Sequence, residues 1–376
     1  MINIVESKNC CGCTSCASIC PKGAISMQPD KEGFLYPVVD KDLCVDCNLC
    51  DKACAFTKEN ENNKPLFTYA VRHNSAEVLE RSSSGGMFTA MSDYVLDKCG
   101  VVYGASFDDN FVIRHTRAES KEQRNAMCGS KYVQSDIRGI FSSIKNDLND
   151  GRLVLFTGTP CQADGLKKFL GQIPENLIIS DLICYGVPSP MVWKDYVDFI
   201  SKINRSVLKE HYFRAYEYGW KEHIALSVFK NGKRYTGNAY SNLFTALYYS
   251  KLVLRPSCYS CPYTCTSRVG DITIADCRGI EKVLPDFECD NGASLVLVNT
   301  QKGKEFYDKI KDVFCSEDIN LDAIMQPPLK GPAKRSARRE QFWDIYLNKG
   351  FKAAIYWHFG RLYSLKQFIK KLIKIK

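Results

Sequence analysis

The sequence predicts a small α+β domain, followed by a larger α/β domain with a mixed sheet. Two observations support this fold class. Two cysteine runs of identical spacing lie before residue 55 and mark a separate N-terminal unit. After residue 66, short apolar segments alternate with turns rich in Gly, Ser and Pro and with helical patterns, an order typical of α/β domains.

Composition excludes several classes of protein. The 376 residues are 25% charged and 45% apolar, which is ordinary for a globular chain and excludes global disorder. No apolar run approaches the roughly 18 residues of a membrane-spanning helix, and residues 1–9 lack the apolar core of a signal peptide. We therefore expect a cytoplasmic protein, where 19 mostly reduced cysteines indicate metal or redox chemistry.

The two N-terminal cysteine runs are internal repeats. Each reads C-x2-C-x2-C-x3-C, and a shift of 34 residues superimposes one on the other. The first run ends in Cys20-Pro21, as the iron–sulfur motif of bacterial ferredoxins does. The runs consist of Cys10, Cys13, Cys16 and Cys20, and of Cys44, Cys47, Cys50 and Cys54.

In this motif the cysteine after the three-residue gap ligates the other cluster. The alternative is a pair of zinc sites, although zinc motifs usually pair two C-x2-C knuckles. Cys11 lies outside the pattern as a spare thiol. The polar segment Thr57–Leu66 ends this domain, which we assign to residues 1–60. We predict one [4Fe–4S] cluster on Cys10, Cys13, Cys16 and Cys54, and a second on Cys44, Cys47, Cys50 and Cys20.

The second domain begins with a strand predicted around Tyr69–Val71. Residues 82–86, with the sequence SSSGG, then precede a run with apolar residues at helical spacing that starts at Met87. We expect a helix with serine at its N-cap. Its free N–H groups and positive dipole end would form an anion cradle, and the alternative is an ordinary capped helix.

Three further apolar segments are each followed by a turn and a helical pattern. After the first, Gly158 turns the chain, Thr159 can cap a helix and Pro160 takes its first position. Ser189 and Pro190 repeat this arrangement after the second. In α/β domains the ligand lies at the C-terminal ends of the strands. The predicted strand and helix pairs are 153–157 with 162–170, 177–184 with 191–203, and 294–299 with 302–313.

A third cysteine group, Cys258, Cys261 and Cys265, follows Arg255-Pro256. With a fourth thiol it could hold a third [4Fe–4S] cluster, and the alternatives are a structural zinc or unligated thiols. No G-x-G-x-x-G follows a predicted strand and no C-x3-C-x2-C occurs, so neither a standard dinucleotide fold nor an S-adenosylmethionine radical enzyme is expected. The fourth thiol would be Cys161, Cys184, Cys277 or Cys289.

Six stretches carry a resemblance to a known family: SSSGGMFTA at 82–90, GSKYVQS at 129–135, LFTGTPCQADGLKKFL at 155–170, DLICYGVPSP at 181–190, RPSCYSCPY at 255–263 and RVGDITIAD at 268–276. Together they resemble the coenzyme F420 hydrogenase/dehydrogenase beta subunit family, which includes bacterial members and a plant reductase of a chlorophyll derivative. The resemblance covers nearly the whole chain with its fused ferredoxin domain. It assigns residues 66–330 to an FAD-binding beta-subunit-like domain.

The resemblance implies FAD beside the iron–sulfur clusters. Cys161 and Tyr185 are the candidates for catalytic roles. Where the family usually has Cys-His-Gly, this chain has Cys184-Tyr185-Gly186, and where it usually has an aromatic residue after the aspartate of the DIT strand, this chain has Cys277-Arg278 after Asp276. The residues expected to line the flavin are Ser83, Ser84, Gly85, Gly86, Met87, Ser130, Lys131, Tyr132, Gly158, Thr159, Pro160 and Gln162.

We expect an iron–sulfur flavoprotein oxidoreductase. Flavin couples two-electron donors to one-electron clusters, so electrons would pass between a carrier (ferredoxin or a reduced deazaflavin coenzyme), the clusters and FAD, and would reduce a small organic substrate. The alternative is a non-catalytic electron-transfer subunit of a larger redox complex. A zinc-bound structural or nucleic-acid protein is a further alternative, but we expect no nucleic-acid partner.

The net charge of +9 comes from the C-terminal segment, residues 331–376. From Arg361 this tail is basic, with apolar residues at Leu365, Phe368, Ile369 and Leu372 in helical spacing. Such a helix could make peripheral contact with an anionic membrane. The alternative is a terminal helix packed on its own domain.

Overall fold

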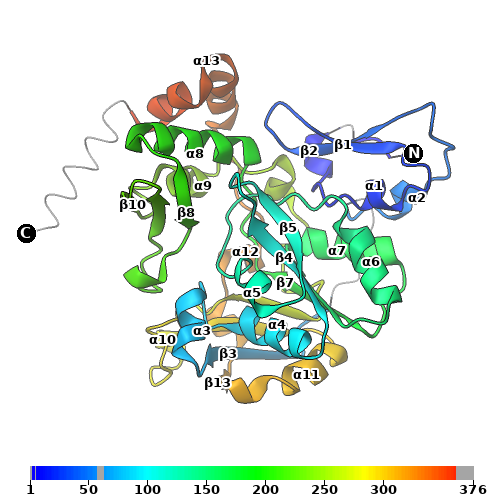
Figure 1. Ribbon diagram of the computed structural model, residues 1–376, viewed down its shortest axis with the longest axis vertical. Coiled ribbons are helices and arrows are strands. Elements are labelled where there is room, and N and C mark those ends of the chain that lie inside the picture. The colour runs from blue at the N-terminus through cyan, green and yellow to red at the C-terminus, as the bar shows by residue number, and fades with distance from the viewer. Residues whose placement is uncertain (1, 5, 57–62, 361–376) are drawn as a thin grey trace, which may run out of the picture.

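The computed structural model describes residues 2–4, 6–56 and 63–360. It has three parts (Figure 1): an N-terminal module, a central eight-stranded sheet, and a unit of helices with a three-stranded sheet. A small α+β module followed by an α/β domain with a mixed sheet confirms the predicted fold class. Residues 361–376 lie outside the described residues, so the amphipathic helix predicted there stays a prediction.

The N-terminal module repeats one local structure around each cysteine run. Helix α1 (Ser15–Ile19) follows Thr14, and helix α2 (Leu49–Lys52) follows Asn48, and both preceding residues have left-handed backbone with φ of 67° and 58°. Thr14 and Asn48 are related by the same shift as the cysteines. Strands β1 (Ile25–Pro29) and β2 (Leu35–Val39) pair antiparallel beside them.

The central sheet has the strand order β13-β3-β12-β11-β7-β6-β4-β5. Strands β4, β6, β7 and β11 run parallel to one another, whereas β5, β12 and β13 run antiparallel to their neighbours. The bounds are β3 Phe67–His73, β4 Val101–Phe107, β5 Ile113–Ala118, β6 Val154–Gly158, β7 Leu177–Leu182, β11 Ile272–Asp276, β12 Ser294–Val298 and β13 Phe314–Asp318.

Helices cover both faces of this sheet. Alternate residues of β6 face opposite layers: Leu155 packs with α4 (Met87–Asp97) and α11 (Gln301–Asp308), whereas Val154 and Phe156 pack with α6 (Ile140–Asn149) and α7 (Pro160–Leu170). This period of two is what a strand buried on both faces requires. The N-terminal module lies on the α6 and α7 side, where α1 contacts both helices (Figure 1).

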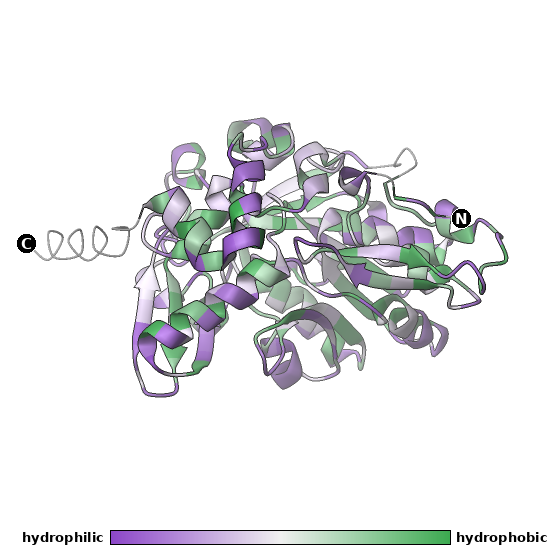
Figure 2. Ribbon diagram, turned by 90° about the horizontal axis from the view of Figure 1, so that it is seen from above, coloured by the Kyte–Doolittle hydropathy of each residue, from purple (hydrophilic) through white to green (hydrophobic). Residues whose placement is uncertain are grey.

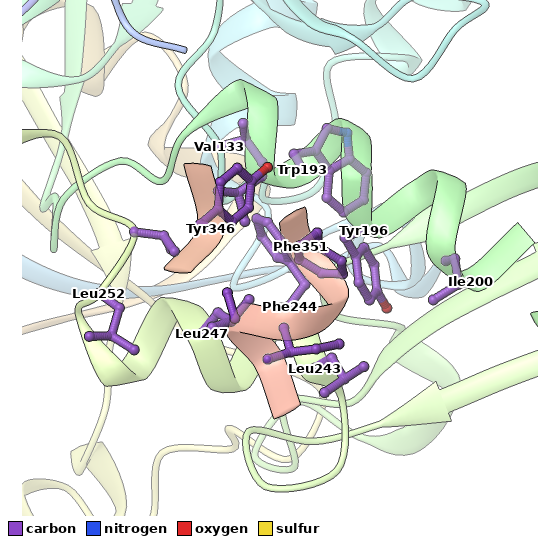
Figure 3. Close-up of a cluster of buried hydrophobic side chains, with 14 of the residues drawn as sticks. Val133, Trp193, Tyr196, Ile200, Leu243, Phe244, Leu247, Leu252, Tyr346 and Phe351 are labelled. Carbon is purple, nitrogen blue, oxygen red and sulfur yellow. The ribbon is translucent and has the colours of Figure 1, made fainter. Parts of the chain in front are cut away.

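The third part packs helices α8 (Pro190–Asn204), α9 (Leu243–Ser250) and α13 (Arg339–Phe359) around a cluster that includes Trp193, Phe244 and Phe351 (Figure 3). Its sheet consists of β8 (Leu208–Tyr212), β9 (Ala225–Phe229) and β10 (Arg234–Gly237). The remaining short helices are α3 Ala76–Arg81, α5 Lys121–Asn125, α10 Ile280–Val283 and α12 Pro327–Lys330.

The local predictions agree with the structure with two differences. Strand β6 with α7 and strand β7 with α8 form as predicted, including the caps Thr159 and Ser189. The N-cap of α4 is Gly86, with φ of 84°, and not a serine. The third strand–helix pair forms, but β12 runs antiparallel to β11, so α11 starts at the opposite edge of the sheet from α7.

Hydropathy follows the same layering. In Figure 2 the outer helices alternate between hydrophilic and hydrophobic residues. Within the described part of the chain, no helix is both long and apolar enough to cross a membrane.

Candidate functional site

The structure brings four of the N-terminal thiols together around α1. Burial raises the pKa of Cys16, and the neighbouring thiols of Cys13, Cys10 and Cys54 raise it further. Burial also raises the pKa of Cys10, which has Cys13 and Cys54 beside it. We call these four residues thiol group I. They are the ligands that the motif predicts for one cluster.

The other four thiols of the repeat face one small hollow in the N-terminal module. Its lining includes Cys20, Cys44, Cys47 and Cys50, which we call thiol group II. Cys47 is exposed, whereas Cys50 is buried. Each group therefore takes three cysteines from one run and one from the other, as the motif predicts.

The residues around group I fit an iron–sulfur cluster better than a zinc ion. Among the described residues, no three His, Cys, Asp or Glu side chains converge closely enough to hold one metal ion. A cube of four irons separates its ligands farther than a single ion does, because each thiolate binds a different corner. The buried hydroxyls of Thr14 and Ser15, between two of the cysteines, also lack a protein partner and suit a sulfur acceptor.

A further four thiols gather at the C-terminal ends of β6 and β7. They are Cys161, Cys184, Cys258 and Cys261, which we call thiol group III. Burial, together with smaller contributions from Cys258 and Cys161, raises the pKa of Cys184 to about 12. Burial likewise raises the pKa of Cys261, with Cys161, Cys258 and Cys184 as its next neighbours. Two of the predicted third-site residues are therefore in this group.

The other cysteines proposed for a third cluster lie elsewhere. The Cys265 thiol donates to the carbonyl of Ser267, in its own loop, at 3.3 Å. Cys277 and Cys289 are buried in a separate apolar cluster with Trp220. The fourth member beside Cys184, Cys258 and Cys261 is therefore Cys161.

Groups I and III adjoin across the boundary between module and central domain. Cys11, the spare thiol of the motif, hydrogen-bonds both Cys13 of group I and Cys161 of group III. A side chain on Gly165 of α7 would place its Cβ 2.8 Å from the Cys13 Sγ. The glycine thus lets the cysteine loop lie directly against α7.

A cavity of about 850 Å³ opens at the C-terminal edge of the parallel strands, beside group III. This volume is at the upper end of the roughly 300–1,000 Å³ of ligand pockets. Cys161 and Tyr185 both line it. Gly85 and Pro160, two of the predicted flavin residues, do not line it; the other ten, which do, are Ser83, Ser84, Gly86, Met87, Ser130, Lys131, Tyr132, Gly158, Thr159 and Gln162.

Two helices begin at the cavity. Helix α4 begins after Gly86, which has no side chain to cap it, so the first N–H groups of the helix remain available to an anion. At the start of α7, the Thr159 N–H donates to the Gln162 side-chain oxygen at 3.0 Å. Ser83 accepts from the N–H of Ser130 at 2.8 Å and ties the two cavity loops together.

A chain of hydrogen bonds fixes the wall between these helices. Gln162 donates to the Ser135 hydroxyl at 3.0 Å, and this hydroxyl donates to His115 Nδ1 at 2.9 Å. His115 Nε2 in turn donates to the carbonyl of Thr157 at 3.0 Å. Burial lowers the pKa of His115 to about 4, so the imidazole is neutral at pH 7 and both nitrogens have a defined role.

The rest of the wall is aromatic on one side and cationic on another. The rings of Tyr132 and Tyr248 stack with centroids 5.3 Å apart, and Tyr185 meets Tyr248 edge to face. Opposite charges meet at Asp276, which accepts from Arg214 at 2.6 Å and from Arg278 at 3.0 Å. Two guanidinium groups on one carboxylate leave this end of the cavity positive.

Lys131 lines the cavity and also binds the carbonyl groups of its own loop. Its ammonium group donates to the carbonyls of Cys128 at 2.8 Å and Ala126 at 2.9 Å. It therefore holds its own loop, and burial lowers the pKa of Lys131 to about 8.

Some cavity residues have no signal in the sequence. Arg214 and Tyr248 come from segments without a motif, and only the fold brings them to the strand ends. Arg278 stands where the family usually has an aromatic residue, and it lies in the cavity wall. His115 is isolated in the sequence and is recognised only by its hydrogen bonds.

Comparisons with known proteins agree with the motifs. Residues 9–57 match the model of the 4Fe-4S dicluster domain, and residues 151–322 match that of the C terminus of the coenzyme F420 hydrogenase/dehydrogenase beta subunit. An uncharacterized ferredoxin of Methanocaldococcus jannaschii is 35% identical over 51 residues, which are 14% of this chain and 65% of that protein. The chain thus spans just under two thirds of this relative's length.

Among solved structures, a chain of the F420-reducing [NiFe] hydrogenase complex of Methanosarcina barkeri is similar with a TM-score of 0.48. It is 16% identical, and the match covers 79% of this chain and 93% of that one. The two family matches confirm the resemblance that the motifs indicate. The chain therefore joins a segment that matches the 4Fe–4S dicluster domain to a segment that matches the C terminus of the coenzyme F420 hydrogenase/dehydrogenase beta subunit.

Proposed function

We propose that this chain is an iron–sulfur flavoprotein oxidoreductase. Groups I and II would each hold a [4Fe–4S] cluster, group III would hold a third, and the central cavity would bind FAD. The domain limits 1–60, 66–330 and 331–376 belong to the same proposal. Electrons would pass between a carrier, the clusters and the flavin, and reduce a small organic substrate.

One observation carries the proposal: two thiols of group III, Cys161 and Cys184, are also wall residues of the cavity. Group III in turn adjoins group I through Cys11. Cys50 of group II shares a buried cluster with Cys16 and Cys54 of group I, so the thiol groups form a series from the surface at Cys47 to the cavity. A mononuclear structural site would need no such series.

The cavity residues suit FAD by their chemistry. Pyrophosphate is recognised by free N–H groups at a helix N-terminus, and α4 offers them because no side chain caps its start. Tyr132 and Tyr248 provide an aromatic surface of the kind on which planar rings stack. When bound, the flavin would accept a pair of electrons and release them singly. Arg214 and Arg278 keep their end of the cavity positive, which favours an anionic substrate or an anionic part of the cofactor.

Tyr185 is the proposed substitute for the family's histidine. Its ring is placed by Tyr248 and by Lys251, whose ammonium lies 5.4 Å from the ring centroid. A tyrosine hydroxyl can donate a proton to a substrate or orient it. Ferredoxin and a reduced deazaflavin are the two electron donors to be compared.

The test is an anaerobic preparation analysed for iron, acid-labile sulfide and flavin. We expect about twelve irons and one flavin per chain, since each [4Fe–4S] cluster contributes four. Bleaching of the flavin by reduced deazaflavin or by reduced ferredoxin then identifies the donor. A colourless preparation without sulfide or flavin would refute the proposal.

The second candidate function is a non-catalytic electron-transfer subunit. The exposure of Cys47 in group II favours it, because a surface cluster can exchange electrons with a partner protein. It predicts that the isolated chain is reduced but turns over no organic substrate. Steady-state assays with the reduced chain and candidate acceptors separate the two functions.

A further inference from the structure

Arg255 is a fully buried cation at the boundary between the N-terminal module and the central domain. None of its side chain is exposed. Its Nε donates to the Cys10 carbonyl at 2.8 Å, Nη1 donates to Gln134 at 2.9 Å, and Nη2 donates to the Leu35 carbonyl at 2.8 Å. The same Nη2 lies 3.5 Å from the Cys10 Sγ.

The surroundings of this guanidinium group contain thiols in place of a carboxylate. Burial lowers the pKa of Arg255, but Cys10, Tyr36, Cys11 and Cys258 raise it above its usual value. The ring of Tyr36 covers one side, 4.4 Å from the guanidinium carbon. Among the described residues, Arg255 forms no ion pair with Asp or Glu. A buried cation needs a compensating anion, and the thiolates are the anions at hand.

Arg255 also lies between two thiol groups. It contacts Cys10 of group I. Its positive charge also lowers the pKa of Cys258 and of Cys161 in group III, although burial and hydrogen bonds have larger effects on these two pKa values. Gly12 leaves room for it, because a Cβ there would meet Nη1 at 2.8 Å. The Arg255 side chain thus packs in the cysteine loop of group I, whereas its backbone lies just before Cys258 and Cys261 of group III in the sequence.

We propose that Arg255 is a positioning residue that raises the reduction potential of the cluster held by group I. The proposal rests on the proposed function, since it requires a cluster at this group. One-electron reduction adds one negative charge to a thiolate-ligated site, and Arg255 keeps its proton throughout. A fixed positive charge and an N–H donor beside the ligand Cys10 stabilise the reduced state more than the oxidised one.

The experiment is an anaerobic redox titration with dithionite, followed by electron paramagnetic resonance, on the full chain. We expect Arg255→Gln to lower one of the cluster potentials and to leave that of group II unchanged, because group II lies outside the contacts of Arg255. Arg255→Lys keeps the charge, so its potential should lie between those of the wild type and Arg255→Gln.

A second variant keeps the guanidinium group in place. Gln134→Glu would set a carboxylate against Nη1 and offset its charge, which should lower the same potential. Gln172→Glu adds the same charge at an exposed position and should change nothing. Gln134→Glu decides the matter if Arg255→Gln does not assemble its clusters.

The outcomes separate this inference from the proposed function. Full iron content with unchanged potentials in both Arg255→Gln and Gln134→Glu would overturn the role of Arg255 and leave the proposed function standing. Wild-type protein without iron or sulfide would refute the proposed function, and this inference with it. If Arg255→Gln does not assemble its clusters, a lowered potential in Gln134→Glu would still support the role of Arg255, and an unchanged one would overturn it.

Discussion

Glu32 and Arg339 form a two-pronged ion pair inside the protein, although 307 residues separate them in the sequence. Arg339 Nη1 lies 2.9 Å from Glu32 Oε1, and Nη2 donates to the other oxygen. The Glu32 side chain is 9% exposed and the Arg339 side chain is 3% exposed. Arg339 also donates to the carbonyl of Leu254 at 3.1 Å. The pair fastens the β1–β2 turn to the start of α13, and so joins the N-terminal module to the third part of the fold.

Removing one partner of this pair should be costly. Arg339→Met leaves the buried Glu32 carboxylate without its cation, and breaking a buried pair typically costs about 3–5 kcal/mol. We expect a loss of this size in the free energy of unfolding, measured by anaerobic urea denaturation.

The matched control is an exposed ion pair formed by residues close to Arg339 in the sequence. Arg335 and Glu340 are 56% and 72% exposed, so Arg335→Ala should cost less than about 1 kcal/mol. The double variant Glu32→Gln/Arg339→Met should recover part of the loss, because it leaves no unpaired charge. Equal losses for the buried and the exposed variant would contradict this assignment.

The composition of group III is tested by two neighbouring cysteines. Cys261→Ser removes a member of the group, and we expect about four fewer irons per chain, since a [4Fe–4S] cluster needs all its ligands. Cys265→Ser should keep the full iron content, because the Cys265 thiol bonds its own loop. Iron and sulfide analysis of both purified variants measures the difference. Iron loss in Cys265→Ser, with none in Cys261→Ser, would reverse the assignment.

Sequence reasoning succeeded where a local pattern determines structure. The cysteine spacing placed thiol groups I and II, since each run folds into the same short loop and helix. Thr159, Pro160 and Gln162 define the start of α7 through contacts between close neighbours in the chain. These features depend on residues that lie within a few positions of one another.

Sequence reasoning failed where distant segments meet. The choice of Cys161 over Cys277 as the fourth member of group III depends on the order of β6, β7 and β11 in the sheet. Arg214 and Tyr248 reach the cavity from segments that carry no periodic signal. Arg255 lies near Cys258 in the sequence, but its contact with Cys10 follows from how the module docks.

The aromatic wall of the cavity should contribute to flavin binding. Tyr132→Leu removes the ring that stacks on Tyr248, and an aromatic pair contributes about 0.5–1.5 kcal/mol beyond its buried area. We expect FAD to bind roughly two- to tenfold more weakly. Fluorescence titration of flavin-depleted protein measures the affinity. Tyr240→Leu, at a ring that is 78% exposed, is the control, and an equal loss there would remove the stacking argument.

Acid sensitivity should arise in part from His211, far from the thiol groups. Its Nδ1 lies 2.9 Å from the Ser227 hydroxyl, and the rings of Trp193 and Phe213 pack against it. Burial lowers the pKa of His211 to about 3, whereas an unfolded histidine titrates near 6.5. Below about pH 6.5 the unfolded chain therefore binds a proton at His211 that the folded chain does not bind. The free energy of unfolding consequently falls as the pH falls from 6.5 toward 3.

Between pH 7 and pH 5 this single group should lower the free energy of unfolding by about 2 kcal/mol. The His211→Asn variant cannot take up this proton. Its free energy of unfolding should therefore change by about 2 kcal/mol less between pH 7 and pH 5, even if the variant is less stable than the wild type at both pH values. Urea denaturation of both proteins at the two pH values gives the difference. All other titrating groups, including the remaining histidines and the cluster ligands, are common to both proteins and cancel. Parallel pH dependence in the two proteins would show that His211 is protonated in the fold.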